Sequence, residues 1–221
     1  MSWDKSWEKL YKKRGWGEYP NEELIKFIAR NFYQYPNRKK IRILELGCGI
    51  GSNLWYLAKE KFKVYGIDGS KTAISKSIKK LDKEVPNWKG QVTTGDIINI
   101  QYPDNFFDAV VDLESITHNS FENSIKIYEE SFRVLKNNGK LFSRTFCVGT
   151  WGDNTGKKLG INSWKVSEGP MKGHCNFIRF TKKNQIKILL KKFDIVNIDK
   201  ISLSVNNEKN KIIEWLIYAK K

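Results

Sequence analysis

The stretch that decides the fold is IRILELGCGIGSNLWYLA, residues 41–58. A mainly apolar run, 41–46, leads into a glycine-rich turn, and a helical pattern follows at once. This succession predicts a strand, a tight turn and a helix. Glycine adopts positive φ without cost and lets a ligand approach the backbone, and the first N–H groups of a helix lack intrahelical partners. The stretch therefore predicts a ligand-binding turn.

The glycine spacing in ELGCGIG, residues 45–51, distinguishes two classes of cofactor. The dinucleotide fingerprint G-x-G-x-x-G would place its third glycine at position 52, which is Ser52. A carboxylate before the turn would repel a pyrophosphate, but it suits a ligand with an ammonium and a sulfonium. The turn resembles motif I of the class I S-adenosylmethionine-dependent methyltransferases. This resemblance implies S-adenosylmethionine as the cofactor, bound by Glu45, Gly47, Cys48, Gly49 and Gly51.

The next apolar run ends at Asp68, followed by Gly69. Asp68 lies about twenty residues past the turn, where a doubly wound fold places the carboxylate that binds the ribose hydroxyls. We include Gly69 among the cofactor-binding residues. Ser70 is the expected N-cap of the following helix, as Asn21 and Thr181 are for two others.

Residues after the later strands add to the expected cofactor site. In the resembled family an acidic residue after the third strand accepts from the adenine amino group. This resemblance implies that role for Asp96, with the N–H of Ile97 meeting a ring nitrogen. The run 107–113 is almost wholly apolar, as in a buried parallel strand, and Leu113 at its end is expected to contact the cofactor.

The resemblance is strong over about residues 40–147 and looser beyond them. It implies an α/β fold, a Rossmann-like doubly wound seven-stranded sheet of order 3-2-1-4-5-7-6 with strand 7 antiparallel and an N-terminal helical cap. The runs 193–203 and 212–219 would be strands six and seven.

We expect a single class I methyltransferase domain over residues 1–221. Its parts would be a helical cap (1–37), a cofactor-binding core (38–147), a substrate lid (148–180) and a C-terminal helix and hairpin (181–221). The segment 148–180 is rich in Gly, Asn, Ser and Lys and is expected to be irregular. So long a connection in a compact domain is usually functional or disordered, which favours a lid.

The N-terminal segment is unusually aromatic. Trp3, Trp7 and Tyr11 recur at helical spacing, and glycines flank Trp16 ahead of Tyr19. A glycine-flanked aromatic loop can close over a cofactor and exclude water, so Trp16 is an expected cofactor contact. The alternative is that these rings only pack a helix on the sheet.

Methyl transfer from a sulfonium is an in-line displacement that needs alignment and, for a hydroxyl or an ammonium, a base. His118 lies just past the fourth strand, where the resembled family often carries a histidine at the mouth of the acceptor site. It is the first candidate base, against the alternative of a structural histidine satisfied by backbone. Glu114 is the second candidate, as base or as orienter of the imidazole, and His174 is the third.

Other chemistries are not indicated. The position of the [ND]PP[YF] motif of amide- and adenine-modifying enzymes reads DLES, residues 112–115, and no Pro-Cys pair suggests a cytosine-C5 enzyme. Three cysteines form no CxxC pair, so we expect no metal site and expect the thiols to pack. Without an apolar leader or an apolar run long enough to span a bilayer, we expect a cytoplasmic protein.

The net charge of +16 admits several partners. Its lysines are scattered, which favours ordinary surface charge over a nucleic-acid footprint without excluding the latter. We predict transfer of a methyl group to an O or N of a small hydroxylated acceptor, with an acidic nucleotide-linked sugar or polysaccharide precursor as one candidate. An RNA or other polyanion methyltransferase is the alternative, and a non-catalytic cofactor-binding protein is a third. The oligomeric state stays open.

Overall fold

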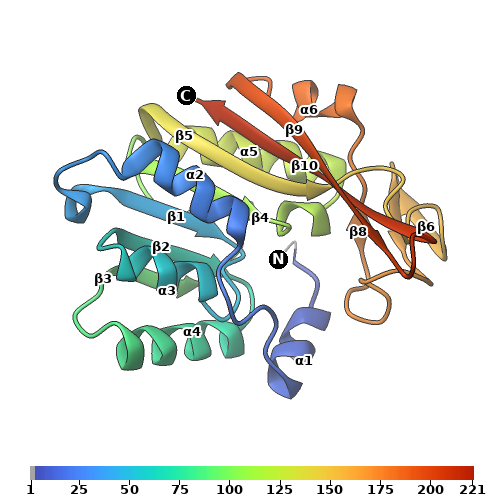
Figure 1. The fold of residues 1–221 in the computed structure, drawn as a ribbon, viewed down its shortest axis with the longest axis horizontal. Helices are drawn as coiled ribbons and strands as arrows, with labels where there is room; N and C mark the ends of the chain where they lie inside the picture. Colours follow the sequence, from blue (N-terminus) through green and yellow to red (C-terminus); the bar gives the residue numbers. More distant parts are fainter. Residues whose placement is uncertain (1–2) are drawn as a thin grey trace.

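The large sheet of the computed structural model, which describes residues 3–221, has the predicted strand order (Figure 1). Its order is 3-2-1-4-5-10-9 in strand numbers, and β10 runs antiparallel to both of its neighbours. This confirms the Rossmann-like seven-stranded sheet with an antiparallel seventh strand. In chain order its strands are β1 (Arg42–Leu46), β2 (Lys63–Asp68), β3 (Lys89–Thr94), β4 (Phe107–Leu113), β5 (Leu135–Phe146), β9 (Asp194–Val205) and β10 (Asn210–Lys220).

Helices cover both faces of this sheet. Alternate side chains of a strand point to opposite faces, so Ile43 packs in one apolar cluster and Leu44 in the other. The cluster around Ile43 is closed by α2 (Glu22–Phe32), α3 (Ser52–Lys59) and α4 (Lys71–Glu84). The cluster around Leu44 is closed by α5 (Phe121–Val134) and α6 (Lys183–Leu189). The remaining helices are α1 (Ser6–Lys13), η1 (Arg38–Lys40) and η2 (Ile116–His118).

The predicted helix starts are correct at two places and wrong at one. The Asn21 side chain accepts from the N–H groups of the second and third residues of α2, and Ser70 Oγ accepts from Ala73 N at 3.0 Å. Thr181 is not an N-cap. It is buried, its Oγ1 accepts from Arg179 Nη1 at 2.9 Å, and α6 begins after Lys182 instead. The hydroxyl is thus used by the buried Arg179 side chain and not by the start of α6.

Segment 148–180 is more regular than expected. It contains β6 (Lys157–Gly160), β7 (Ser163–Lys165) and β8 (Ile178–Arg179), which form a three-stranded sheet. A small apolar cluster, separate from the main core, stabilises it, and Trp7 from α1 packs against this cluster. The buried members are Phe146, Val166, Met171, Cys175, Ile178 and Phe180.

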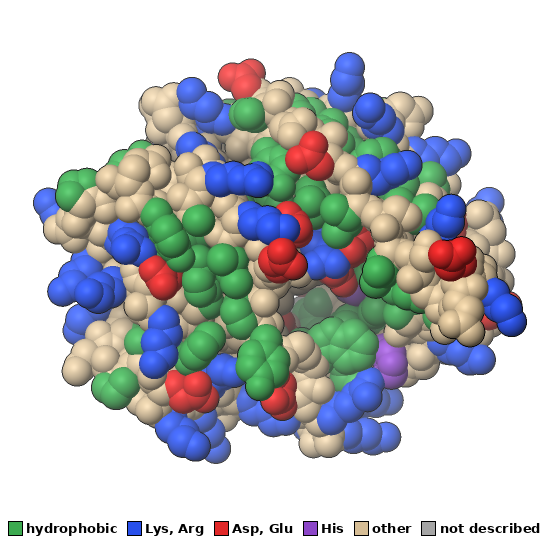
Figure 2. All heavy atoms as spheres, viewed as in Figure 1, with side chains coloured by type: hydrophobic (Ala, Val, Ile, Leu, Met, Phe, Trp, Pro, Cys, Tyr) green, Lys and Arg blue, Asp and Glu red, His purple; other side chains and the backbone are tan. Residues whose placement is uncertain are grey.

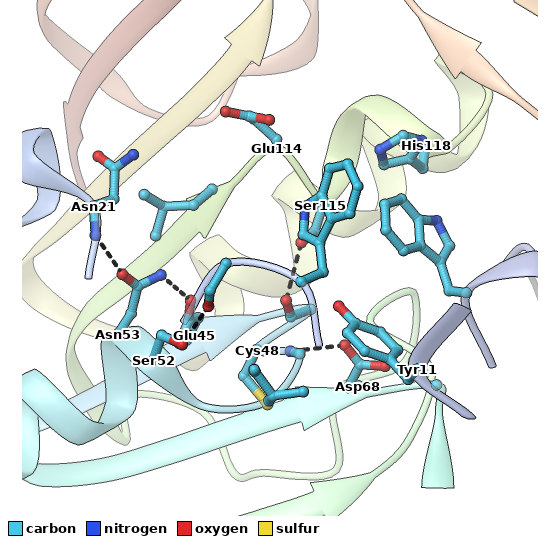
Figure 3. A pocket seen from close by; sticks show the side chains of 18 of the residues that line it. Tyr11, Asn21, Glu45, Cys48, Ser52, Asn53, Asp68, Glu114, Ser115 and His118 are labelled. Carbon is cyan, nitrogen blue, oxygen red and sulfur yellow. Dashed lines mark hydrogen bonds between the residues drawn. The ribbon is translucent and has the colours of Figure 1, made fainter. Parts of the chain in front are cut away.

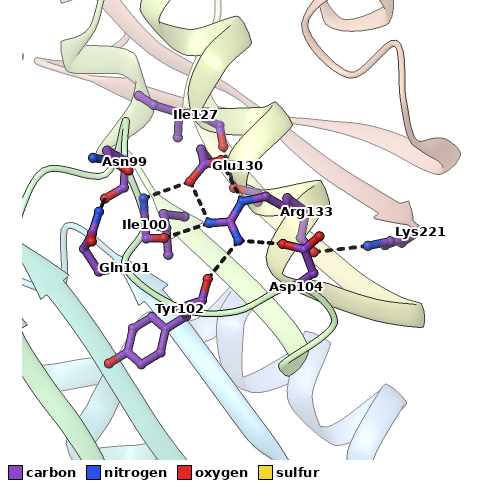
Figure 4. Close-up of polar contacts among 10 residues, drawn as sticks. Asn99, Ile100, Gln101, Tyr102, Asp104, Ile127, Glu130, Arg133 and Lys221 are labelled. Atoms are coloured by element: carbon purple, nitrogen blue, oxygen red, sulfur yellow. Dashed lines mark hydrogen bonds and ion pairs between the residues drawn. The ribbon is translucent and has the colours of Figure 1, made fainter.

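Arg133 of α5 fixes the connection between β3 and β4 (Figure 4). Its Nη2 donates to the carbonyl of Ile100 at 2.7 Å, and Nη1 donates to the carbonyl of Tyr102 at 2.8 Å. It also forms ion pairs with Asp104 and Glu130.

Among residues 3–221, no helix is long and apolar enough to cross a membrane.

Candidate active site

A cavity of about 500 Å³ lies where β1, β2 and β4 end, bounded also by the N-terminal segment and by segment 148–180 (Figure 3). Figure 2 shows a hollow on this face with apolar side chains and a histidine beside it. Most predicted site residues line the cavity: Trp16, Glu45, Gly47, Cys48, Gly49, Asp68, Gly69, Ile97, Leu113, Glu114 and His118. Segments far apart in sequence therefore converge on one site.

Gly51 and Asp96 are not among the described residues that line this cavity. Gly51 is the N-cap of α3 with φ of 80°, and a Cβ there would lie 2.1 Å from Ser77 Oγ. This glycine permits close packing of α3 on α4. Asp96 Oδ1 accepts from Ile98 N at 3.3 Å. Contact of either residue with the cofactor stays a prediction.

Gly47 and Gly49, the two glycines of the turn that line the cavity, leave no room for a side chain. Gly47 and Gly49 have φ of 64° and 52°, which L side chains rarely adopt. A Cβ on Gly47 would lie 2.1 Å from Ser115 Oγ, and one on Gly49 would lie 2.7 Å from the Tyr11 hydroxyl. Tyr11 of α1 thus reaches the turn from a different part of the chain.

Asp68 ends β2 beside this turn. Its Oδ2 accepts from Gly49 N at 2.9 Å and its Oδ1 accepts from Ser70 N at 2.8 Å. Burial raises the pKa of Asp68, and these two hydrogen bonds act against that rise. Each carboxylate oxygen keeps a second lone pair, so the side chain can also accept from two ligand hydroxyls.

Glu45 supplies an acceptor on the same wall. Its Oε1 accepts from Asn53 Nδ2 at 2.6 Å, and Oε2 is buried without a hydrogen-bond partner among the described residues. Burial raises the pKa of Glu45 to about 8. A cation in the cavity would stabilise its ionised form and satisfy Oε2. This orphan oxygen fits the ammonium-bearing cofactor predicted from the turn.

The chain turns sharply after β4. Glu114 has φ of 65°, uncommon for a residue other than glycine. The buried carboxylate of Asp112 stabilises this turn, because its Oδ1 accepts from Ser115 N at 2.9 Å and from Ile116 N at 3.0 Å. The turn directs both Glu114 and His118 to the cavity.

His118 is held in one tautomer. Its Nδ1 lies 2.9 Å from the carbonyl oxygen of Phe177, which can only accept, so Nδ1 carries the proton. The lone pair of the neutral ring is then on Nε2. The Trp7 ring packs edge-on against the imidazole at 4.9 Å. Burial lowers the pKa of His118, which favours the neutral, basic form.

Glu114 does not orient the imidazole, because the described partner of Nδ1 is Phe177. It shares Arg144 with Glu214 instead. Arg144 donates to both carboxylate oxygens of the buried Glu214, through Nε at 3.0 Å and through Nη2, and its Nε lies 3.3 Å from Glu114. One guanidinium thus faces two carboxylates. Burial raises the pKa of Glu114 to about 8, and repulsion from Glu214 is the second cause of this rise.

Asn119 follows the candidate base and also lines the cavity. Its Nδ2 donates to Ser115 O at 3.3 Å, and its buried Oδ1 has no partner among the described residues. The buried Arg179 of β8 donates to the Asn119 carbonyl at 3.3 Å and to Ser124 Oγ at 3.1 Å. These bonds hold the backbone that carries Asn119.

The N-terminal segment closes one side of the cavity. Glu8 of α1 accepts from Ser70 Oγ at 2.6 Å and from Thr72 Oγ1 at 2.7 Å, at the start of α4. Asp4 accepts from Asn176 N at 2.5 Å, which joins the segment to the opposite wall. Trp16 is 36% exposed at the rim. The segment therefore bridges the core and segment 148–180.

Sequence reasoning missed several lining residues. Tyr11, Asn53 and Asn119 come to the cavity through tertiary contacts. The aromatic spacing of α1 was a usable signal for Tyr11. Asn119 could have been noted as the neighbour of His118, whereas nothing in the sequence connects Asn53 with Glu45.

Comparisons with known proteins support a methyltransferase domain. The family model of a methyltransferase domain matches residues 43–139. A sterol 24-C-methyltransferase from Aspergillus fumigatus is 29% identical over 165 residues, 67% of this chain and 43% of that protein. A phosphoethanolamine N-methyltransferase from Plasmodium falciparum is 27% identical over 109 residues, 48% of this chain and 40% of that one. The chain thus spans less than half the length of these relatives.

A solved structure supports the fold. A methyltransferase from Methanosarcina mazei, described as dependent on S-adenosylmethionine, superposes with a TM-score of 0.67 at 23% identity. The match covers 88% of this chain and 96% of that one. Residues 43–139 thus match a methyltransferase domain, and the sheet order and the glycine turn agree with the class I S-adenosylmethionine-dependent methyltransferases, which supports S-adenosylmethionine as the cofactor.

Proposed function

We propose that this chain transfers a methyl group from S-adenosylmethionine to a nitrogen or oxygen of a small molecule. The observation that carries the proposal is the single cavity shared by Glu45, Asp68 and His118. Residues suited to the cofactor and a residue suited to proton removal thereby face one volume. S-adenosylmethionine supplies, when bound, a methyl group on a sulfonium sulfur that a nucleophile can displace.

The chain's own residues would hold the cofactor at the glycine turn. Asp68 would accept from the ribose hydroxyls, and the orphan Oε2 of Glu45 would accept from the ammonium group. Tyr11 and Trp16 would exclude water from that side, since both line the cavity and α1 is anchored through Glu8. Exclusion of water strengthens electrostatic interactions at the reacting centre.

His118 would act as the base. A neutral imidazole with its proton on Nδ1 can take a proton at Nε2 from an acceptor hydroxyl or ammonium. The bond to Phe177 would become stronger as the ring acquires charge. Segment 148–180 supplies this carbonyl, which supports its role as a substrate lid.

The residues that line the cavity indicate which kind of molecule can receive the methyl group. None of the described lining residues is Lys or Arg, although the chain carries +16 overall. A nucleotide-linked sugar or an RNA would bring phosphates with no cation to meet them in this cavity, so neither expectation gains support. The proposed acceptor is therefore a small molecule without phosphate. The relatives named for phosphoethanolamine and sterol do not by themselves assign either acceptor to this chain.

Calorimetry with S-adenosylhomocysteine, followed by a screen of small amines and alcohols with labelled S-adenosylmethionine, tests the proposal. We expect binding of the cofactor product and acceptor-dependent transfer of label. A chain that fails to bind S-adenosylhomocysteine would contradict the proposed function. A chain that binds it but transfers no label to any acceptor would support the non-catalytic alternative.

A further inference from the structure

We propose that the methyl acceptor is an amine that binds as its ammonium form against Glu114 and Asn119. The inference rests on the proposed function, because it concerns the acceptor half of the same cavity. It goes further by naming the chemical class of the acceptor and the residues that select it.

The first observation is that hydrogen-bond acceptor atoms dominate the part of the cavity where the methyl acceptor would bind. Nδ2 of Asn119 is used by Ser115 O, which leaves Oδ1 buried and without a partner among residues 3–221. Nδ1–H of His118 is used by Phe177 O, which leaves the lone pair of Nε2. Glu114 adds a carboxylate. A ligand that satisfies these groups must bring hydrogen-bond donors.

The second observation is an incompletely paired carboxyl group, that of Glu114. Arg144 donates to both oxygens of Glu214, and its Nε lies 3.3 Å from an oxygen of Glu114, so two carboxyl groups share one cation. Asp4 and Glu22 are the further acidic residues of the lining outside the cofactor wall, and no described lining residue is Lys or Arg. A positively charged ligand beside Glu114 would favour its ionised carboxylate over the protonated form that its raised pKa allows.

Aromatic rings complete the environment for a cation. Trp7 and Trp16 line the cavity, with ring centroids 6.0 Å apart, and Trp7 also contacts His118. Tryptophan faces attract ammonium groups through their quadrupole. The same rings would contact an apolar body on the amine.

These features distinguish an amine from an alcohol. A hydroxyl donates one hydrogen bond and carries no charge, whereas a primary ammonium donates three and is cationic. An ammonium therefore brings enough donors for acceptor groups such as Glu114, Oδ1 of Asn119 and Nε2 of His118. It gives one proton to Nε2, and its freed lone pair forms the carbon–nitrogen bond as the carbon–sulfur pair returns to sulfur, which yields a methylammonium and a neutral thioether.

The test uses matched ligand pairs on the full chain saturated with S-adenosylhomocysteine. Phenethylamine is titrated against phenethyl alcohol, cyclohexylamine against cyclohexanol, and ethanolamine against phosphoethanolamine, with calorimetry as the readout. We expect each amine to bind at least about tenfold more tightly than its alcohol, the scale of one hydrogen bond to a charged group. Phosphoethanolamine should bind more weakly than ethanolamine.

Two variants test whether Glu114 and Asn119 cause the preference for amines over alcohols. Glu114→Gln should remove most of the preference for amine over alcohol and leave the affinity for S-adenosylhomocysteine unchanged. Asn119→Ala should weaken amine binding in the same way and serves if Glu114→Gln does not fold. Glu129→Gln is the matched control, because Glu129 pairs with Lys191 away from the cavity.

The outcomes separate this inference from the proposed function. If S-adenosylhomocysteine binds but amines show no advantage over alcohols, or no ligand of either kind binds, the inference is wrong and the cofactor site stands. An amine preference that survives both variants would also overturn it. Failure to bind S-adenosylhomocysteine would instead remove the proposed function.

Discussion

Nδ1 of His118 donates a hydrogen bond to the carbonyl oxygen of Phe177, 2.9 Å away. The candidate base after β4 is therefore oriented by segment 148–180. Because the carbonyl fixes the tautomer, Nε2 is the basic atom of the neutral ring. The relationship connects the state of that segment with proton removal.

Replacing His118 by Asn should lower turnover by about a hundredfold, the scale of a lost general base. The affinity for S-adenosylhomocysteine should stay the same, since the imidazole serves the acceptor. Steady-state kinetics and calorimetry measure the two effects, and thermal denaturation checks the fold. His174→Asn is the control, because His174 contacts Arg14 and Trp16 and is not among the described residues that line the cavity. If the control variant loses turnover and His118→Asn does not, His174 is the base.

The pH dependence of kcat/KM should show His118 as a group that must be neutral. Burial lowers its pKa, with the Phe177 bond and Asp4 acting in the opposite direction. The rate should fall as pH decreases through that lowered pKa, so the acidic limb lies below the ordinary value of about 6.5. The limb should vanish in His118→Asn. A midpoint well above the ordinary value would contradict the burial argument.

Asp68→Asn should weaken S-adenosylhomocysteine binding by about tenfold to a hundredfold, because ribose hydroxyls lose a charged acceptor. Stability should fall as well, since Gly49 N and Ser70 N both donate to this carboxylate. Calorimetry on folded protein separates the two effects. Asp194→Asn, on the exposed start of β9, should leave affinity unchanged. Unaltered affinity in Asp68→Asn would mean that another group binds the ribose.

Amide exchange in residues 148–178 should slow when S-adenosylhomocysteine and a methylatable acceptor are both present. The segment carries the Phe177 carbonyl and contacts the N-terminal segment through Asp4 and Asn176. Closure over the acceptor should protect its backbone further. Mass spectrometry compares the ternary complex with the binary one. Equal exchange in the two complexes would show that the segment is not a lid.

Glu8→Gln should loosen α1 and speed amide exchange in residues 6–13. Hydrogen bonds from Ser70, and then from Thr72, lower the pKa of Glu8 to about 2. The contribution of the carboxylate is thus complete above the ordinary pKa of 4.5 and is lost as pH falls toward about 2. Glu18→Gln, in the loop after α1, is the control. If exchange in α1 is the same in both variants, Glu8 does not hold this helix.

The sequence alone predicted what depends on local pattern. The apolar runs at β1, β2 and β4, the glycine turn at 47–49 and Asp68 follow from side-chain periodicity and from backbone conformations that glycine permits. The sheet order came from resemblance and is confirmed. Thr181 was assigned wrongly as an N-cap because a local propensity competes with the buried bond to Arg179.

Only the tertiary structure decided the environment of the acceptor site. The Arg144 guanidinium between Glu114 and Glu214, the Phe177 carbonyl on His118 and the orphan Oδ1 of Asn119 join residues distant in the chain. The net charge of +16 likewise gave no sign that the described cavity lining holds neither Lys nor Arg. Periodicity reports which residues are buried, whereas the partner of a buried polar group depends on how distant segments pack.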